Sequence, residues 1–481
     1  MRFEDEAFNA LVSATPENGG YGDGYGVTQK HLDKVTSFYS YQFKDNKDIT
    51  NLNDLYKFKN LTSIEVAAFS GCTNLKTVVF TKNVTISPYA FSNISKLEKV
   101  VFPKDYLPTI ISENSFANSL IDKVYIPNSI KTLGSQCFFV NNADRVMSLV
   151  IGEGLESCGD NILYRGKSIV YIKSVEQWLK ISGVGSLLVN QLYLYNDIEE
   201  IIEDKGIYGN ITVDYDWGKL ERERKEVTLP MVNEALKEVT EIKANACANM
   251  TQLKGELVIP DNITSIGSRS FQACSNINSI KIEGDITDID NFAFGDMGNI
   301  ESLKINRVDY INLYSFLNTT TQNVYVNSLQ DWLNIKFGDQ SSNPMYKGSN
   351  LYINNVLATD ITINADAISD FGFINCKSLE RLILNGVTRI GTLAFQSCSN
   401  LTGKLVISSS IKDFGNSCFA GTGLTEVVVE EGFTSFGYTQ FENCSSLRVV
   451  DLPSTLTSMG INTFKVCPSL AAIIIRAITP P

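Results

Sequence analysis

The 481-residue sequence is poor in the residue types on which most catalytic and metal sites depend. It has a single histidine, His31, which excludes histidine-based catalytic triads and metal sites built from several histidines. The glycine-rich segment 19–26 lacks the lysine of a phosphate-binding loop and the strand that should precede it. No run approaches the roughly 18 consecutive apolar residues of a membrane-spanning helix. We therefore expect no cofactor, no metal and no enzymatic activity.

Basic side chains are outnumbered by acidic ones, which gives a formal net charge of −12 at pH 7. The lysines and arginines form no stripe, so the chain lacks the electrostatic footprint of nucleic-acid binding. Carboxylate pairs for glycoside hydrolysis stay possible because Asp and Glu are plentiful, but no motif frames them. With 43% hydrophobic and 20% charged residues, the composition predicts a soluble folded chain.

The first six residues, Met-Arg-Phe-Glu-Asp-Glu, are too acidic and too poor in apolar residues to open a secretory signal. Either the chain is intracellular or its signal has been removed. A polar start fits a chain that begins at a mature N-terminus.

A short unit recurs from Leu61 almost to the C-terminus, and one clear copy runs from Ile263 to Ile282. Its aromatic residue serves as a marker, and uninterrupted neighbouring markers lie 22 to 25 residues apart. A fixed period in this range, with Leu, Ile and Val at set offsets, predicts a leucine-rich repeat solenoid whose units stack on one another. The markers are Phe69, Phe91, Phe116, Phe138, Phe271, Phe294, Phe316, Phe373, Phe395, Phe419, Phe441 and Phe464.

Each unit predicts two short extended segments and a corner. Residues 121–127 alternate apolar and variable positions, as a strand does, and residues 263–267 end in Gly267, which allows a sharp turn. The Ala-Phe-x-x-Cys step at 394–398 is too short for an independent helix and predicts a single helical turn. We expect a β-rich α/β solenoid with a parallel sheet, a curved right-handed superhelix of about 14 turns over residues 59–481.

Two insertions, at about 168–197 and 322–356, resemble each other at a constant offset of 154 residues. In each, Ser174 or Ser328 is placed to cap a short helix that contains Trp178 or Trp332. We expect the tryptophans to pack these helices on the solenoid, with an exposed ligand platform as the alternative. The charged run 221–226 is expected to be a solvated loop or helix face.

Six of the ten cysteines occupy one repeat position. On stacked turns their side chains would lie about 4.8 Å apart with parallel Cβ vectors, which is poor geometry for bridging. We interpret them as buried thiols, with disulfides as the alternative. They are Cys72, Cys274, Cys376, Cys398, Cys444 and Cys467.

One residue of each strand, between the last two apolar positions, is expected to point away from the core. Apolar and aromatic side chains there could contact a protein or a glycan, but strand propensity alone also favours valine and tyrosine. Both interpretations stay open. This predicted ladder consists of Val79, Val101, Tyr125, Lys281, Lys304, Tyr325, Ile383, Val428 and Asp451.

From Leu61 onward the chain resembles the BspA-like leucine-rich repeat family of bacterial surface proteins, which is common in Bacteroides and its relatives. The segments that carry this resemblance are 266–274, 390–398 and the paired tryptophan insertions. The resemblance implies export, frequently as a lipoprotein, and binding of host or bacterial surface components. It names no ligand.

Residues 1–58 differ from the repeats and predict a helical cap over the first turn, with helical segments at 4–12 and 27–35. In relatives this region often resembles a dockerin or EF-hand helix pair. Here Gly20, Gly22 and Gly24 stand where carboxylates should, and His31 replaces the closing glutamate, which leaves too few oxygen ligands for Ca²⁺. We expect a degenerate helix-loop-helix cap without metal.

Our leading hypothesis is a non-enzymatic cell-surface or secreted protein that binds a protein or glycan in the manner of an adhesin. The expected location is outside the cell or on its outer membrane, with membrane attachment only through a lipid anchor that lies outside this sequence. The alternatives are a structural spacer of the cell envelope without a dedicated ligand and, less favoured, a carbohydrate-active enzyme.

Overall fold

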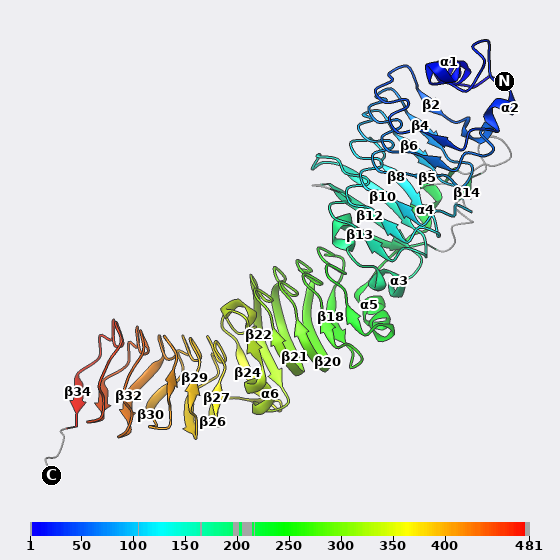
Figure 1. Cartoon of the computed structure of the whole chain (residues 1–481). Coiled ribbons are helices and arrows are strands. Elements are labelled where there is room, and N and C mark those ends of the chain that lie inside the picture. The colour runs from blue at the N-terminus through cyan, green and yellow to red at the C-terminus, as the bar shows by residue number, and fades with distance from the viewer. Residues whose placement is uncertain are drawn as a thin grey trace. The chain divides into compact units, whose positions relative to one another are not determined.

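The computed structural model describes residues 2–103, 105–163, 166–195, 202–203, 214–215 and 217–476. The chain divides into two compact units, unit 1 (Met1–Val227) and unit 2 (Thr228–Pro481). Each unit is a stack of parallel strands from successive turns (Figure 1). The described residues form about 19 turns of β-solenoid with little helix, which confirms the predicted fold class; the prediction was about 14 turns for residues 59–481 alone.

In unit 1 the strands of the solenoid begin before residue 59. Strand β1 (Ser37–Phe38) lies parallel to β3 (Ser63–Ile64), and β2 (Asn51–Leu52) lies parallel to β4 (Thr77–Val79). Two three-stranded sheets contain β1, β3 and β5 (Thr85–Ile86), and β2, β4 and β6 (Lys99–Val101). A third contains β7 (Ile110–Ile111), β9 (Thr132–Leu133) and β11 (Ser157–Cys158). The largest contains β8 (Lys123–Ile126), β10 (Val146–Ile151), β12 (Lys167–Ile172), β13 (Val189–Leu194) and the antiparallel β16 (Lys225–Glu226). The pair β14 (Ile202–Glu203) and β15 (Asp214–Tyr215) is antiparallel.

Unit 2 opens with α5 (Leu229–Ala235) and a nine-stranded sheet. That sheet contains β17 (Glu241–Ile242), β18 (Gly255–Ile259), β19 (Ser265–Ile266), β20 (Ile277–Ile289), β21 (Gly298–Ile311), β22 (Thr319–Val326), β23 (Lys336–Phe337), β24 (Asn350–Ile353) and β25 (Val356–Leu357). The later turns supply β26 (Asp360–Asn364) with β28 (Arg381–Asn385), and β27 (Ala367–Ile368) with β29 (Arg389–Ile390) and β31 (Asp413–Phe414). They end in a sheet of β30 (Thr402–Ile407), β32 (Gly423–Val429), β33 (Val449–Leu452) and β34 (Ala472–Ile475).

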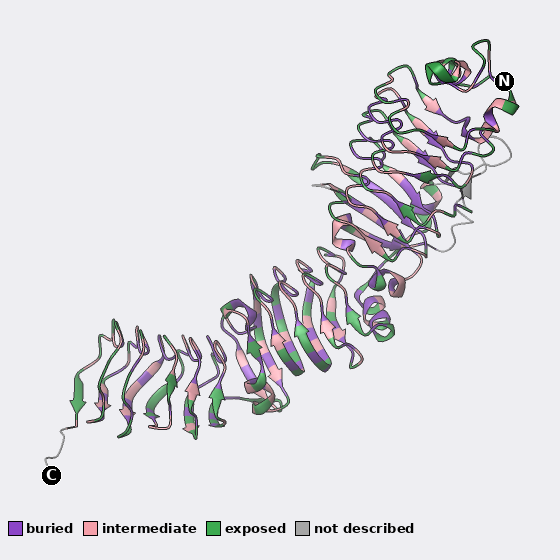
Figure 2. Cartoon of the chain, viewed as in Figure 1, coloured by how far each residue is buried: buried purple, intermediate pink, exposed green. Residues whose placement is uncertain are grey.

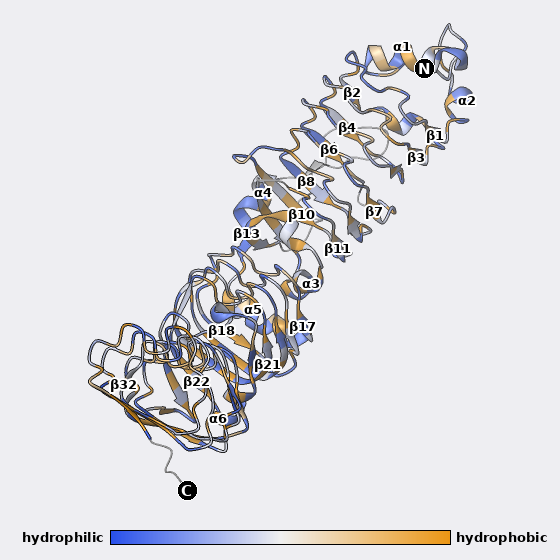
Figure 3. Ribbon diagram, turned by 60° about the vertical axis from the view of Figure 1, so that its left-hand side comes forward, coloured by the Kyte–Doolittle hydropathy of each residue, from blue (hydrophilic) through white to orange (hydrophobic). Residues whose placement is uncertain are grey.

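The phenylalanine markers form stacks in the core, as predicted. Phe395 is fully buried, and its ring centroid lies 5.1 Å from those of Phe373 and Phe419, with only 3° between the ring planes in each pair. Figure 3 shows hydrophobic and hydrophilic residues interspersed along the ribbon, and the buried residues are mostly the hydrophobic ones. A copy can also lack the marker: Cys247 occupies its place in the first repeat of unit 2, which is one reason why markers undercount the turns.

The corners that hold the markers are overlapping β-turns and not the single helical turns that we predicted. In the Phe69 copy the amides of Ala68, Ser70 and Cys72 each donate to the carbonyl three residues earlier. The backbone is left-handed at Ala67 (φ 55°) and Gly71 (φ 76°), which interrupts any helix. The Phe69 amide donates across to the Ala90 carbonyl of the next turn at 2.9 Å, so each corner also joins neighbouring turns.

All ten cysteines are free, and eight are buried. The predicted burial is confirmed, with Cys467 only half-buried. The thiols also donate hydrogen bonds to the preceding turn, which the sequence did not indicate. The Cys398 Sγ lies 3.0 Å from the Phe373 carbonyl oxygen, and the Cys444 Sγ lies 3.2 Å from that of Phe419.

The N-terminal segment contains α1 (Glu6–Ser13) and the short α2 (Gln29–Leu32). Phe8 of α1 is buried, with its ring centroid 5.6 Å from that of Phe43 and 6.2 Å from that of Phe38 in the first turn. The glycine-rich loop wraps the C-terminus of α1. The Gly20 amide donates to the Thr15 carbonyl at 3.0 Å, and the Gly22 amide donates to the Ala14 carbonyl at 2.8 Å. A Cβ at either glycine would overlap backbone atoms.

Within the described ranges, no three or more His, Cys, Asp or Glu side chains are grouped so that they could hold a metal ion. No helix there is long and apolar enough to cross a membrane.

Removing one stacked ring should destabilise unit 2. We expect Phe395→Ala to lower the free energy of unfolding by about 3–5 kcal/mol, because it leaves a cavity between two rings. Denaturant titration followed by circular dichroism measures this loss. Leu313→Ala, at a side chain that is 43% exposed, is the control and should change the value by less than about 1 kcal/mol. Equal losses in the two variants would contradict the stacked core.

The buried thiols should make stability depend on alkaline pH. Burial raises the pKa of Cys72 and of Cys274 to about 12, whereas an unfolded thiol titrates near 8.5. Because the folded pKa is the higher one, this stabilisation is complete below about pH 8.5 and is lost as the pH rises toward 12. We expect the free energy of unfolding to fall by about 1.4 kcal/mol per pH unit for each such thiol.

Denaturation midpoints at pH 8, 9 and 10 measure this slope. Cys274→Ala should flatten it, and Cys467→Ala, at a half-buried thiol, should flatten it less. The prediction fails if Cys274→Ala leaves the slope unchanged.

Candidate binding surface

The structure corrects the predicted ladder in unit 1. Val79, Val101 and Tyr125 are only 7%, 4% and 3% exposed, so none of them presents a side chain to a ligand. Burial raises the pKa of the Tyr125 phenol to about 12. Much of β10 and β12 beside Tyr125 is buried as well (Figure 2).

The sheet around Tyr125 is buried because helix α4 (Trp217–Glu223) covers it. Leu220 of α4 joins one buried cluster with Tyr125, Tyr171 and Tyr193, and Trp217 packs against that cluster. Trp217 and Leu220 lie three residues apart and so share one face of the helix. The charged run 221–226 is exposed apart from the half-buried Arg224, as predicted for a solvated helix face.

The charges of this run contact the sheet directly. The Arg224 guanidinium carbon lies 4.1 Å from the Tyr193 ring centroid, and Arg224 donates to the Tyr171 hydroxyl at 3.3 Å. Glu221 pairs with Lys123 of β8 at 3.5 Å. The sequence contains a signal for this cover, because Trp217 and Leu220 lie three residues apart just before the charged run 221–226.

The insertion helices are capped as predicted. In α3 (Val175–Lys180) the Ser174 hydroxyl accepts from the Gln177 amide at 3.2 Å, and in α6 (Leu329–Asn334) Ser328 plays the same part. Trp178 and Trp332 are each 1% exposed, so they pack the helices and offer no platform to a ligand. The Trp332 indole also donates to the Gly372 carbonyl at 2.9 Å.

In unit 2 the predicted ladder reaches the surface. Strand register places Lys281, Lys304, Tyr325 and Tyr352 side by side on β20, β21, β22 and β24. Lys304 is exposed, and the other three are half-buried. We call these four residues the polar strip.

The polar strip is tightly packed along its length. The Tyr325 and Tyr352 rings stack with centroids 4.5 Å apart and 19° between their planes, and the Lys304 Nζ lies 5.9 Å from the Tyr325 centroid. Lys281 pairs with Glu283 at 2.5 Å, and this bond raises the pKa of the Lys281 ammonium. Lys281 therefore stays charged at neutral pH.

A second row of polar side chains runs beside the polar strip, two residues further along each strand and hence on the same face. It contains Glu283, Asn306 and Asn327, and the Asn327 amide donates to Asn306 at 2.6 Å. Asn354 and Asn355, with φ of 50° and 61°, form the two-residue turn between β24 and β25. The two rows border a hollow of about 330 Å³, which is lined by residues of β20, β21 and β22 and by the turn that follows β24.

Further along unit 2 the exposed face becomes apolar. Ile383, Val406 and Ile474 are 57%, 42% and 50% exposed, and Val428 is half-buried beside Val406. A hollow of about 440 Å³ lies next to Ile383, between β26, β28 and β30. We call Ile383, Val406 and Val428 the apolar strip.

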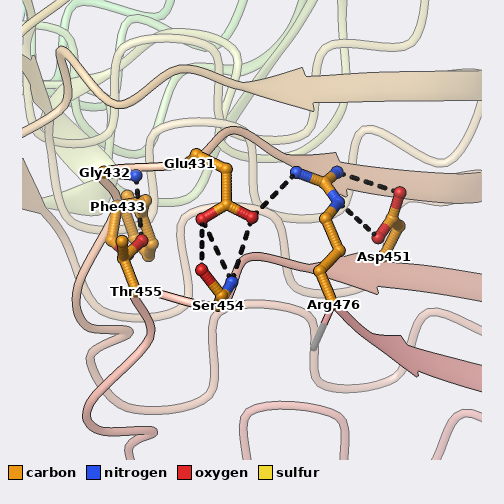
Figure 4. Close-up of polar contacts among 7 residues, drawn as sticks. All are labelled: Glu431, Gly432, Phe433, Asp451, Ser454, Thr455 and Arg476. Carbon is orange, nitrogen blue, oxygen red and sulfur yellow. Dashed lines mark hydrogen bonds and ion pairs between the residues drawn. The ribbon is translucent and has the colours of Figure 1, made fainter. Parts of the chain in front are cut away.

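Asp451 follows Val428 in register, but its carboxylate is already occupied. Arg476 donates to both of its oxygens, at 3.0 and 2.9 Å, and also lies 3.6 Å from Glu431 (Figure 4). Glu431 in turn accepts from the Ser454 hydroxyl at 2.9 Å. This network joins the last three turns, so Asp451 acts within the fold more than as an open ligand site.

The repeats and their stacking define a leucine-rich repeat protein. The model of the BspA type leucine rich repeat region matches residues 29–145, 62–183, 231–341 and 366–479. The chain therefore belongs to the BspA-type leucine-rich repeat family, as the sequence resemblance predicted.

Three solved structures of leucine-rich repeat proteins or antigens from bacteria are similar to this chain. A leucine rich cell surface protein from Faecalibacterium prausnitzii is 16% identical over 78% of this chain and 84% of its own, with a TM-score of 0.38. A leucine-rich repeat protein from Bacteroides ovatus is 16% identical over 88% and 85%, with a TM-score of 0.39. The pneumococcal vaccine antigen PcpA is 13% identical over 87% and 93%, with a TM-score of 0.29. No curated protein matches the chain.

Removing the cover of the unit 1 sheet should expose its tyrosines. We expect Leu220→Asp to detach α4 and to raise the hydroxyl-radical labelling of Tyr171 and Tyr193 several-fold, measured by mass spectrometry, because a carboxylate is costly to bury in this cluster. Glu223→Ala, at an exposed position of the same helix, should leave the labelling unchanged. Unchanged labelling in Leu220→Asp would show that α4 does not shield these rings.

Proposed function

We propose that this chain is a non-enzymatic cell-surface or secreted repeat protein that binds a macromolecular partner, a protein or a glycan, through the exposed sheet face of unit 2. The observation that carries this proposal is a contrast between equivalent faces. Helix α4 covers the large sheet of unit 1, whereas Lys304 and Ile383 of unit 2 are exposed.

The apolar strip supports a contact with a large partner. Exposed isoleucine and valine side chains on successive strands, beside a hollow of about 440 Å³, give a binding surface the apolar centre that tight association uses. A single exposed apolar residue needs no explanation, but a contiguous row does. Strand propensity explains why these residue types occur in strands; it does not explain why they stay uncovered here.

Membership of the BspA-type family favours export to the cell surface. We propose that the mature protein acts outside the cell, with any membrane attachment through a lipid anchor. A cytosolic location in surface-labelling experiments on intact source cells would overturn this part of the proposal.

The proposal is tested with purified protein on arrays of extracellular-matrix proteins and glycans. We expect the double variant Ile383→Asp/Val428→Asp to lose roughly tenfold or more in affinity, because buried carboxylates oppose an apolar contact. Leu107→Asp, at a 68% exposed residue of unit 1, is the matched control and should bind like the wild type. Circular dichroism checks that each variant folds.

Two results would count against the proposal. Equal binding by the double variant and the wild type would remove the apolar strip from the binding surface. Failure of the wild type to bind any protein or glycan would favour the alternative of a structural spacer.

A further inference from the structure

The polar strip differs from the apolar strip in what it offers a ligand. The residues at positions 281, 304, 325 and 352 are Lys, Lys, Tyr and Tyr, and those of the neighbouring row at 283, 306, 327 and 354 are Glu, Asn, Asn and Asn. A third row on the other side, at 279, 302, 323 and 350, reads Ser, Ser, Asn and Asn in the same register. These three rows contain no aliphatic side chain, so this zone lacks the apolar centre of a protein–protein interface.

The stacking of the tyrosines limits the chemistry of the ligand. Tyr325 has the Tyr352 ring 4.5 Å away and the Lys304 ammonium 5.9 Å from its centroid. The ring face that a sugar would stack on is therefore taken by neighbouring side chains. Because strand side chains stand roughly perpendicular to the sheet, the rings direct their edges and hydroxyl groups outward. The strip offers hydrogen-bond donors and positive charge, and its ligand should be rich in acceptors.

The lining of the hollow carries more positive than negative groups. Two lysines and one glutamate line it, and two further carboxylates, those of Glu256 and Asp285, accept hydrogen bonds from Ser279 and Asn306 of the neighbouring rows. Lys304 forms no ion pair with a carboxylate among the described residues, so its ammonium can meet a ligand anion. Lysine acts as a compact point charge without fixed bidentate geometry, which suits anions whose orientation varies along a chain.

The repeat geometry favours a polymer over a small anion. Neighbouring strands of a sheet lie about 4.8 Å apart, so the donors of the polar strip recur at a short regular interval across four strands. The hollow extends across β20, β21 and β22 to the turn that follows β24. An extended chain with regularly spaced acidic groups can meet several of these donors at once, whereas a small anion can meet only one or two.

We propose that the polar strip and the asparagine row beside it bind an anionic polysaccharide, with lysine ammonium groups on its carboxylate or sulfate groups and asparagine and tyrosine side chains on its hydroxyls. This proposal deepens the proposed function, on which it rests, by giving the ligand class of one part of the surface. Glu283 competes with the ligand for Lys281, because the two side chains pair at 2.5 Å.

The test measures binding of full-length protein to four probes by biolayer interferometry at low and at moderate ionic strength. Polygalacturonate carries carboxylates, dextran sulfate carries sulfates, dextran is the neutral polysaccharide and polyglutamate is the acidic peptide. We expect binding to one or both anionic polysaccharides, no binding to dextran, and weakening as salt screens the lysines. The two anionic probes distinguish a carboxylate from a sulfate ligand.

Three variants locate the site. Lys281→Gln/Lys304→Gln keeps side-chain length, removes both charges and should weaken polysaccharide binding roughly tenfold. Lys254→Gln/Lys412→Gln removes two exposed lysines elsewhere in unit 2 and should have no effect, which controls for net charge. Glu283→Gln should strengthen binding several-fold, because it releases Lys281 from its ion pair.

The outcomes separate this inference from the proposed function. Equal loss in the two lysine double variants, stronger binding to polyglutamate than to either anionic polysaccharide, or unchanged affinity in Glu283→Gln would each overturn the polysaccharide assignment. None of these results depends on Ile383 or Val428, so the apolar strip can fail its own test while the polar strip passes, and the reverse.

Discussion

The contact between successive turns is the constraint on which the whole structure depends. At most corners the marker amide donates to a carbonyl of the next turn, and in the core the ring of one marker lies on the ring of the next, as with Phe395 and Phe419. Neither contact exists within a single repeat. A turn is therefore stable only when neighbouring turns stack on it. The surfaces of the solenoid are built from side chains that recur once per turn.

Because of this recurrence, the residue types at one register position determine the chemistry of an exposed face. In unit 2 that position is lysine and then tyrosine in the nine-stranded sheet, isoleucine in β28 and valine in the last sheet, so successive sheets of one stack present chemically distinct zones. In unit 1 the same kind of face is closed by α4. The difference between the two units lies in a segment outside the repeats, and it decides where a partner can reach the sheet.

The sequence predicted the stacked fold, the buried markers and thiols, and the capped insertion helices, because each follows from a local pattern of period or spacing. It did not predict the conformation of the corners. Bulky residues such as Arg269 and Phe292 have positive φ values there, 55° and 57°, at positions where the sequence has no glycine to indicate them. It also misplaced Val79, Val101 and Tyr125, which are all buried, and for Tyr125 the cover is α4, a segment outside the strand pattern. A strand pattern tells which way a side chain points; it cannot tell what lies above it.

The free thiols have a consequence for where such a stack can exist. Five of them donate a hydrogen bond to the preceding turn in their reduced form, as Cys398 does to Phe373, and no disulfide joins any pair of turns. Folding therefore requires no oxidant, and a disulfide reductant leaves the stack intact.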